Sequence, residues 1–375
     1  MNKKSGKKSF NRYIGLVLFY SASVFLLLEA SLRIYYAVTD KIPPHFDYSV
    51  RKEWQWVRER ATSGNASFNE KFDYDPWIGW NNRANLYTEE VKINAEHMRN
   101  KQEFSAGPHP RQKRLVILGD SFSFGYGVSN EQTYAAQLAD NYLQDWEVLN
   151  LSVSATGTDQ QIINYRRYGK KYEPDIVVLG FYLLDYSRNL IRFRYYAKPM
   201  FELDEGRLVL TNSPVPAPEE LYQKYVSGER KIGGWGYSYA IAAFAEPIIN
   251  HEKRDRSKGS AGRKLLAALM LRFRDDIVAQ GAVPIWLILP DRDIVEKGRS
   301  KYEEIGAFSQ DVAKELGMAV INMDGPFRAF AEESPDQPIW RPKDIGGHLS
   351  STGHSLVAKG LHRYMDENGL LQKSD

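Results

Sequence analysis

The sequence contains no cysteine, which excludes disulfide bonds, thiolate metal sites, a cysteine nucleophile and a lipid-modified cysteine anchor. It also has no low-complexity tract, heptad run or internal repeat, which argues against a fibrous or solenoid protein. Neither sign of charge dominates, since 50 basic residues stand against 47 acidic ones among 375 residues. Outside residues 1–33 the two signs nearly balance, so nothing indicates a nucleic-acid-binding surface.

An uncharged, mostly apolar run is present near the N-terminus. It covers residues 13–28, or 13–32 if Glu29 lies near an interface, and so reaches the length of about 20 residues that a membrane helix needs. Five basic residues precede it, and the positive-inside rule then predicts a cytoplasmic N-terminus and an exported remainder. A cleaved signal peptide is the alternative, because residues 21–23 are small. These residues lie inside the run rather than after it, which favours an uncleaved anchor.

The length of the chain indicates one large domain with accessory segments. We expect a basic cytoplasmic tail at 1–12, a transmembrane signal anchor at 13–33, a juxtamembrane and capping region at 34–113, and a main domain at 114–375. The capping region is irregular and contains four tryptophans. Residues 195–260 break the pattern of the main domain and are expected to form an insertion near the substrate.

From residue 114 onward, apolar runs alternate with helical patterns, as they do in parallel β/α units. The runs are rich in Val, Ile and Leu, as expected for strands covered on both faces. We expect strands at 114–118, 147–153, 175–183, 283–289 and 318–323, and helices at 132–144, 159–171, 265–280, 303–316 and 352–368. The pattern predicts an α/β fold with a central parallel sheet.

A candidate nucleophile, Ser121, follows the first of these strands in the sequence Gly119-Asp120-Ser121. The end of a strand in an open parallel sheet is the usual place for a ligand or a catalytic side chain. Backbone N–H groups at the start of a following helix would favour negative charge there. The alternative is a helix N-cap, with Asp120 or Ser121 accepting hydrogen bonds from the first turn.

A serine nucleophile needs a base, a group that orients the base, and donors for an oxyanion. Asp344 and His348 lie on one glycine-containing loop before the last helix, so the acid could hold the imidazole of His348. Two other histidines, His354 and His362, fall on that helix and are expected to be packing or surface residues. Gly157 follows the second strand, where its backbone N–H could approach a ligand closely.

The order of these blocks resembles the SGNH/GDSL hydrolase superfamily over residues 114–365. Upstream, residues 75–80 and 93–94 with Arg99 are similar to segments of membrane-anchored bacterial members. The resemblance implies a three-layer α/β/α flavodoxin-like sandwich with a central parallel sheet. It also implies Ser121 as nucleophile, His348 as general base and Asp344 as its orienting acid. The implied oxyanion donors are the backbone N–H groups of Ser121 and Gly157, and no metal or cofactor is implied.

The sequence departs from the family pattern at two places. Leu184 stands where the family has an asparagine that donates to the oxyanion, so Asn189 is a candidate replacement. Asp344 precedes His348 by four residues, whereas the family usually has two or three. Two further acids have structural interpretations: Asp185 either bonds to the loop of Ser121 or lies on a surface turn, and Asp159 caps or opens a helix.

We therefore expect an extracytoplasmic serine esterase, held in a bacterial inner membrane by one helix, with its catalytic domain in the periplasm. Its substrate would be an acylated small molecule, glycan or lipid of the envelope, with a short acyl group, and nucleic acid is not an expected partner. One alternative is an O-acyltransferase acting on an envelope polysaccharide. Another is a non-catalytic glycan-binding protein on a hydrolase fold, which Leu184 suggests.

Overall fold

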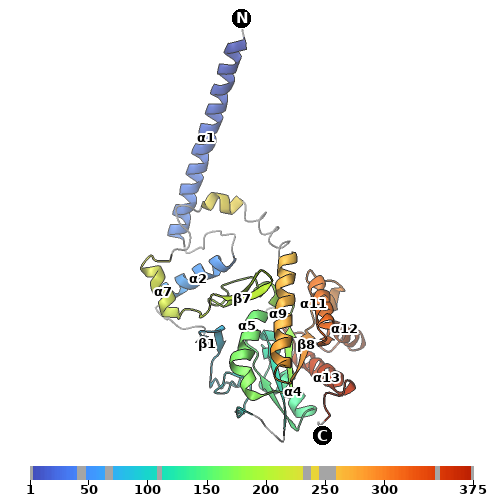
Figure 1. Ribbon diagram of the computed structural model, residues 1–375. Coiled ribbons are helices and arrows are strands. Elements are labelled where there is room, and N and C mark those ends of the chain that lie inside the picture. Colours follow the sequence, from blue (N-terminus) through green and yellow to red (C-terminus); the bar gives the residue numbers. More distant parts are fainter. Residues whose placement is uncertain are drawn as a thin grey trace. The chain divides into compact units, whose positions relative to one another are not determined.

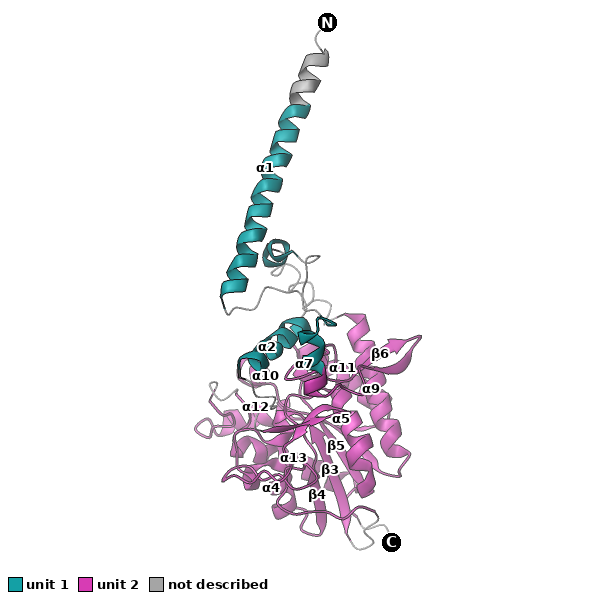
Figure 2. Ribbon diagram, turned by 90° about the vertical axis from the view of Figure 1, so that its left-hand side faces the viewer, with its two compact units in different colours: residues 1–64, 221–255 teal, residues 65–220, 256–375 magenta. Residues whose placement is uncertain are grey.

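The computed structural model describes residues 3–39, 48–63, 71–107, 112–230, 238–244, 259–342 and 347–372, with side chains from residue 11 onward. Contacts among these residues divide the chain into two compact units. One unit contains residues 1–64 and 221–255, and the other contains residues 65–220 and 256–375 (Figure 2).

A five-stranded parallel sheet forms the centre of the larger unit (Figure 1). Its order is β4-β3-β5-β8-β9, so the chain starts near the middle and crosses over in both directions. The strands are β3 (Lys113–Gly119), β4 (Trp146–Asn150), β5 (Ile176–Phe181), β8 (Val283–Ile288) and β9 (Ala319–Asn322). All five expected strands are present and parallel, which confirms the α/β fold with a central parallel sheet.

Helices cover both faces of this sheet, because alternate side chains of each buried strand point to opposite faces. Leu115 and Ile117 pack with one set of helices, made of α4 (Tyr134–Asn141), α12 (Asp324–Glu333) and α13 (Ser351–Glu367). On strand β8, Trp286 contacts Phe273 of the other set, which is made of α5 (Thr158–Asn164), α9 (Ser260–Val278) and α11 (Glu303–Glu315). The result is a sandwich of three layers.

All five expected helices are present, with shifted ends. The helix expected at 159–171 is α-helical only to Asn164 and continues as a π turn and a 3₁₀ turn to Tyr172. Three short helices have no counterpart among the expectations: α3 (Ser121–Phe124), α6 (Leu184–Arg188) and α10 (Arg292–Lys297). The longer α12 was also missed. The three short helices contain too few turns for a periodic apolar pattern to appear.

The segment before the sheet is bonded to the strand β4 and to the loop that follows it. It forms an antiparallel hairpin from β1 (Phe72–Asp75) and β2 (Gly79–Asn82). The indole N–H of Trp80 donates to the carbonyl of Ser154 at 3.0 Å, and the backbone N–H of Arg99 donates to the carbonyl of Asn150 at 2.9 Å. These bonds fix residues 72–100 beside the edge of the sheet where the candidate site lies.

The expected insertion adds an antiparallel pair, β6 (Met200–Asp204) and β7 (Arg207–Thr211), followed by α7 (Pro218–Val226). A buried ion pair attaches the start of this insertion to the larger unit. Lys198 Nζ donates to Asp159 Oδ2 at 2.5 Å, and both side chains are almost completely buried. Burial raises the pKa of Asp159 and lowers the pKa of Lys198, while their mutual attraction acts in the opposite sense.

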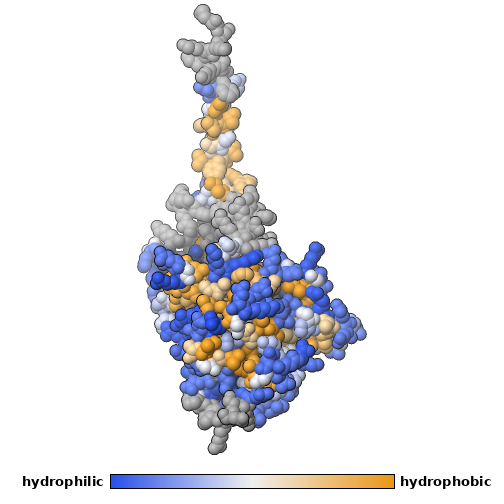
Figure 3. Space-filling view, turned by 45° about the vertical axis from the view of Figure 1, so that its right-hand side comes forward, coloured by the Kyte–Doolittle hydropathy of each residue, from blue (hydrophilic) through white to orange (hydrophobic). Residues whose placement is uncertain are grey.

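The smaller unit contains α1 (Lys3–Val38) and α2 (Tyr48–Ser63). In the part of the chain that the structure describes, one stretch, Asn11–Val38, is long and apolar enough to cross a membrane or to act as a signal sequence. Its apolar side chains are exposed, and Figure 3 shows them along the helix. Near the C-terminal end of α1, Glu29 accepts hydrogen bonds from the hydroxyl of Ser238 and the backbone N–H of Ala240, both at 2.8 Å.

Candidate active site

Ser121 lies at the junction between β3 and α3, above the carboxyl edge of the sheet. Asp120 is the N-cap of α3 and accepts from the backbone N–H of Phe122 at 2.9 Å, so the capping role belongs to Asp120. The junction requires glycine at position 119, because a Cβ there would lie 2.3 Å from Ser123 Oγ and 3.0 Å from the carbonyl oxygen of Gly180. The tight turn therefore leaves the hydroxyl of Ser121 available for another interaction.

His348 makes that interaction. Its Nε2 lies 2.9 Å from Ser121 Oγ, although 227 residues separate the two in sequence. The backbone around His348 is held by an isolated antiparallel bridge between Trp340 and Leu349 and by a hydrogen bond of 2.7 Å from the N–H of Arg341 to the carbonyl of His348. A hydroxyl and an imidazole at this distance have the geometry that proton transfer from a nucleophile requires.

The proposed orienting acid, Asp344, lies in residues 343–346, which are outside the described part of the chain. The described residues on either side meet, since the N–H of Gly347 donates to the carbonyl of Pro342 at 3.3 Å. The role of Asp344 as the acid stays a prediction.

The two competing histidines have other surroundings. His354 is buried on α13, and its Nδ1 accepts from the backbone N–H of Tyr134 at 3.2 Å. Burial, together with the charges of Arg99 and His348, lowers the pKa of His354 to about 3. His362 stacks on the ring of Tyr142 with centroids 4.7 Å apart. His354 thus has a packing and hydrogen-bonding role, and neither histidine reaches Ser121.

The backbone N–H of Ser121 has no acceptor among the described residues, which suits an oxyanion donor. The second expected donor, Gly157, is different: its N–H donates to Gln160 Oε1 at 3.2 Å, and Gly157 does not line the cavity beside Ser121. Ala155 does line that cavity, and its N–H has no acceptor within the described chain. Gly157 stays a prediction, and Ala155 is a second candidate for the same role.

Ala155 was missed because the sequence pointed to a glycine. Its φ of 66° lies in the left-handed region, which is unfavourable for a residue with a Cβ. Such strain in a residue that lines the cavity is a reason to suspect a functional position. No single-sequence pattern distinguishes an alanine of this kind from an ordinary one.

Replacing Ala155 by glycine is expected to stabilise the protein by about 0.5–1 kcal/mol, because glycine relieves the left-handed strain at a smaller entropic penalty. The backbone N–H is retained, so kcat for an ester substrate should change less than about threefold. Urea unfolding and steady-state kinetics measure the two effects. A lower free energy of unfolding in Ala155→Gly would contradict the inference that the left-handed conformation strains Ala155.

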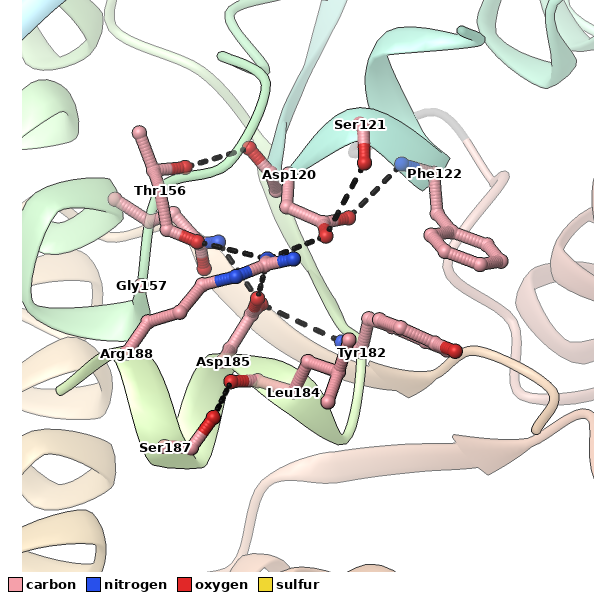
Figure 4. Close-up of polar contacts among 12 residues, drawn as sticks. Asp120, Ser121, Phe122, Thr156, Gly157, Tyr182, Leu184, Asp185, Ser187 and Arg188 are labelled. Atoms are coloured by element: carbon pink, nitrogen blue, oxygen red, sulfur yellow. Dashed lines mark hydrogen bonds and ion pairs between the residues drawn. The ribbon is translucent and has the colours of Figure 1, made fainter. Parts of the chain in front are cut away.

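Two acids and an arginine lie below the serine, as Figure 4 shows. Arg188 Nη1 donates to Asp120 Oδ2 and to Asp185 Oδ1, each at 2.6 Å. Asp185 is fully buried and also accepts from Gln161 at 3.0 Å. Burial and the nearby charge of Asp120 raise the pKa of Asp185 well above its ordinary value. The structure therefore does not place Asp185 on a surface turn. Asp185 is connected to the loop of Ser121 through Arg188, which binds both Asp185 and Asp120.

Leu184 lines the cavity, as its alignment with the family asparagine predicts, and contributes no donor there. Asn189, the candidate replacement, is buried, and its Oδ1 accepts from the backbone N–H of Asp159 at 3.1 Å. It is not among the residues that line the cavity. Asp159 lies in the first turn of α5, as expected, and its partner Lys198 was not foreseen.

A cavity of about 790 Å³ opens above Ser121 and His348. Aromatic rings and basic side chains dominate its lining, and Glu90 is its one carboxylate among the described residues. The rings belong to Phe72, Phe122, Phe124, Tyr126, Tyr182 and Tyr195, and the basic groups to Lys71, Arg99, Arg188, Arg194 and Arg341. Several of these residues come from the segment before the sheet, so that segment forms a wall of the site. Among the described residues, no cluster of three or more metal-ligating side chains occurs.

No family model and no curated protein matches the sequence. Among solved structures, the chain is similar to TesA, with 15% identity over 68% of this chain and 99% of that one and a TM-score of 0.37. It is also similar to the psychrotrophic esterase EstA from Pseudoalteromonas sp., with 12% identity over 69% and 100% of the chains and a TM-score of 0.37. A third is Axe2, an acetylxylan esterase from Geobacillus stearothermophilus, with 13% identity over 68% and 94% of the chains and a TM-score of 0.39.

Other similar structures are described as lipolytic proteins of the G-D-S-L family, including one from Veillonella parvula with 10% identity over 69% of this chain and 100% of that one and a TM-score of 0.38. The neighbours thus include esterases and proteins of the G-D-S-L family. At such low identity and TM-score the likeness carries no argument about activity. The chemistry of this chain therefore rests on the geometry of its own site.

Proposed function

We propose that the protein is a serine esterase of the SGNH type that hydrolyses carboxylic esters. The observation that carries this proposal is the distance of 2.9 Å between Ser121 Oγ and His348 Nε2, at the carboxyl edge of a parallel sheet and inside a cavity. A non-catalytic binding protein would have no need for a hydroxyl and an imidazole in this arrangement. The pairing therefore favours an enzyme over a decayed hydrolase fold.

In the proposed reaction, His348 Nε2 accepts the proton of Ser121 as Oγ attacks the ester carbonyl. The tetrahedral intermediate collapses when the imidazolium returns this proton to the leaving alcohol, and an acyl-enzyme remains. Water, deprotonated by His348, then releases the carboxylic acid and restores Ser121. Asp344 is the proposed acid that orients the imidazole. The N–H of Ser121, with that of Gly157 or Ala155, is proposed to donate to the oxyanion.

The lining of the cavity supports a substrate larger than a simple acyl group. Aromatic rings suit the faces of sugar rings, and the excess of basic side chains suits negative charge. We infer an acylated glycan or lipid of the cell envelope, with a short acyl group at Ser121 and the acidic remainder along the basic wall. The apolar run in α1 and the five basic residues that precede this run support a single-pass inner-membrane anchor with the site in the periplasm.

A fluorophosphonate probe tests the proposal on the full chain in detergent. We expect one label per chain, and peptide mapping should place it on Ser121, because only an activated serine attacks the probe rapidly. Hydrolysis of p-nitrophenyl acetate should release free acetate in the same preparation. If the folded protein neither takes up the probe nor hydrolyses any short-chain ester, the proposal is wrong.

An acyltransferase would also react with the probe, so the fate of the acyl group must be followed. With an acetylated donor and an added acidic polysaccharide, a hydrolase releases acetate at the rate of donor consumption. If most of the acetyl groups are transferred to the polysaccharide, the activity is O-acyl transfer and not hydrolysis. The nucleophile and base proposed here serve both reactions.

A further inference from the structure

At the position of Leu184, the family has an asparagine that donates to the oxyanion, and this chain has no such donor there. Leu184 and Arg188 are four residues apart, at the first and last positions of α6, and therefore lie on the same side of this short helix. Both line the cavity that contains Ser121 and His348. The side chain of Leu184 offers no donor, whereas the guanidinium of Arg188 offers five.

The donors of Arg188 are only partly used. All three of its hydrogen bonds are made by Nη1, which donates to Asp120, to Asp185 and to the carbonyl of Thr156 at 3.1 Å. Nε is buried and has no partner in the described part of the structure. Nη2 makes none of the three hydrogen bonds and has no described acceptor. A fixed guanidinium with unused N–H groups at the wall of a cavity is ready to bind an anion.

The guanidinium is also close to the nucleophile. Asp120 Oδ2 lies 3.5 Å from Ser121 Oγ and 2.6 Å from Arg188 Nη1, so Nη1 is within about 6 Å of Oγ. Figure 4 shows the three side chains in this sequence. The oxyanion of a tetrahedral intermediate is two bonds from Oγ, so a cationic group at this separation from Oγ is near enough to act on it.

We propose that Arg188 stabilises the oxyanion in this site and takes the part that an asparagine plays at the position of Leu184. The inference rests on the proposed esterase function and adds a catalytic residue to it. Arg188 acts in two ways: its Nη2 group donates to the developing oxyanion, and its charge neutralises the carboxylate of Asp120. Without that neutralisation, a carboxylate 3.5 Å from Ser121 Oγ would oppose the negative charge of the transition state.

The charges around Arg188 keep it cationic. Burial alone would disfavour the guanidinium charge, but Asp120 and Asp185 outweigh it and raise the pKa of Arg188 further. The two ion pairs also fix the plane of the guanidinium before substrate arrives. Such preorganisation is what makes an oxyanion donor effective, since no group has to reorient during the reaction.

Arg188→Lys is the first test, because lysine keeps the charge and loses the fork of N–H groups. We expect kcat for p-nitrophenyl acetate to fall about 10²–10³-fold with a much smaller change in KM, because the lost contacts exist mainly in the transition state. Inhibition by a boronic acid, whose tetrahedral adduct places an oxygen at the oxyanion position, should weaken in parallel. Adding Leu184→Asn to this variant should restore kcat at least tenfold by supplying an amide donor.

A purely structural arginine would give a different result. Arg188→Lys would then lower the melting temperature, leave kcat of the folded fraction within about threefold, and gain nothing from Leu184→Asn. That outcome would overturn the proposal. Fluorophosphonate labelling of Ser121 in the wild-type protein separates this failure from a failure of the esterase function.

Leu184→Asn alone keeps the test decisive if the Arg188 variants do not fold. If Arg188 already stabilises the oxyanion, a new amide beside it should change kcat less than about tenfold. A rise of 10²-fold or more would show that the wild-type site lacks a donor, and Arg188 would then have no such role. Leu184→Ala is the matched control for the change in side-chain volume.

Discussion

Replacing Ser121 by alanine is expected to lower kcat for ester hydrolysis by at least about 10⁴-fold, because no other group can form the acyl-enzyme. Fluorophosphonate labelling should disappear at the same time. Circular dichroism and the melting temperature should stay close to those of the wild-type protein, because Asp120, and not Ser121, caps the helix α3. Steady-state kinetics with p-nitrophenyl acetate measure the effect.

His348→Ala should produce a loss of similar size, and the double variant Ser121→Ala/His348→Ala should be no worse than either single one. The reason is that the two side chains act as one unit, so removing the second causes no further loss of kcat once the first is absent. Ser123→Ala is the matched control, since Ser123 is also buried and lies on the same helix but does not line the cavity. Losses that add in the double variant would contradict a shared nucleophile and base.

The sheet could be predicted from the sequence because its strands are buried on both faces. A run such as Leu115–Leu118 has no polar residue to pack against water, so its composition alone indicates a central parallel strand. The order of the motifs along the chain then placed Ser121 and His348 at the same edge. Their meeting at 2.9 Å follows from topology more than from any local pattern.

The residues that surround this pair were harder to predict. Arg188 lies on a helix of five residues with no periodic pattern, and its importance depends on Asp120, which is 68 positions away. Ala155 adopts a backbone conformation that sequence analysis assigns to glycine. The role of Arg188 depends on a distant residue, and that of Ala155 depends on a dihedral angle. Neither property can be read from the neighbouring sequence.

The segment before the sheet was expected to cap the main domain, but its contribution to the cavity was not foreseen. Arg99 binds this segment to the loop that follows Ser121. Its guanidinium donates to the carbonyl of Val128 at 2.7 Å and to that of Gly125 at 3.1 Å, and it lies 4.4 Å from the ring centroid of Phe124. Burial lowers the pKa of Arg99 to about 10, which still leaves it cationic at neutral pH. The loop after the nucleophile is thus fixed by a residue from outside the β/α pattern.

Replacing Lys198 by methionine is expected to destabilise the larger unit by about 3–5 kcal/mol, because it leaves the carboxylate of Asp159 buried without its cation. Lys198 is completely buried and also donates to the carbonyls of Ile191 and Pro199, at 3.2 and 3.0 Å. This loss is a large part of the 5–15 kcal/mol that typically stabilises a domain. Urea unfolding followed by tryptophan fluorescence measures it.

The pH dependence of the variant identifies the cause. Burial already raises the pKa of Asp159, and loss of Lys198 removes the attraction that opposed this shift. In the variant, the folded state then holds a proton on Asp159 that the unfolded state releases above its ordinary pKa. The folded state binds more protons, so stability should decrease as the pH rises above about 4 and level off beyond the raised pKa. The wild-type protein should show a much weaker trend.

Adding Asp159→Asn to Lys198→Met supplies the control, because the amide retains hydrogen-bonding atoms without a charge. We expect the double variant to recover a large part of the lost stability and to lose the pH trend, since only the buried charge is removed. A double variant as unstable as Lys198→Met would mean that the aliphatic stem and the carbonyl contacts of Lys198 carry the stability. In that case the ion pair between α5 and the insertion would be secondary to packing.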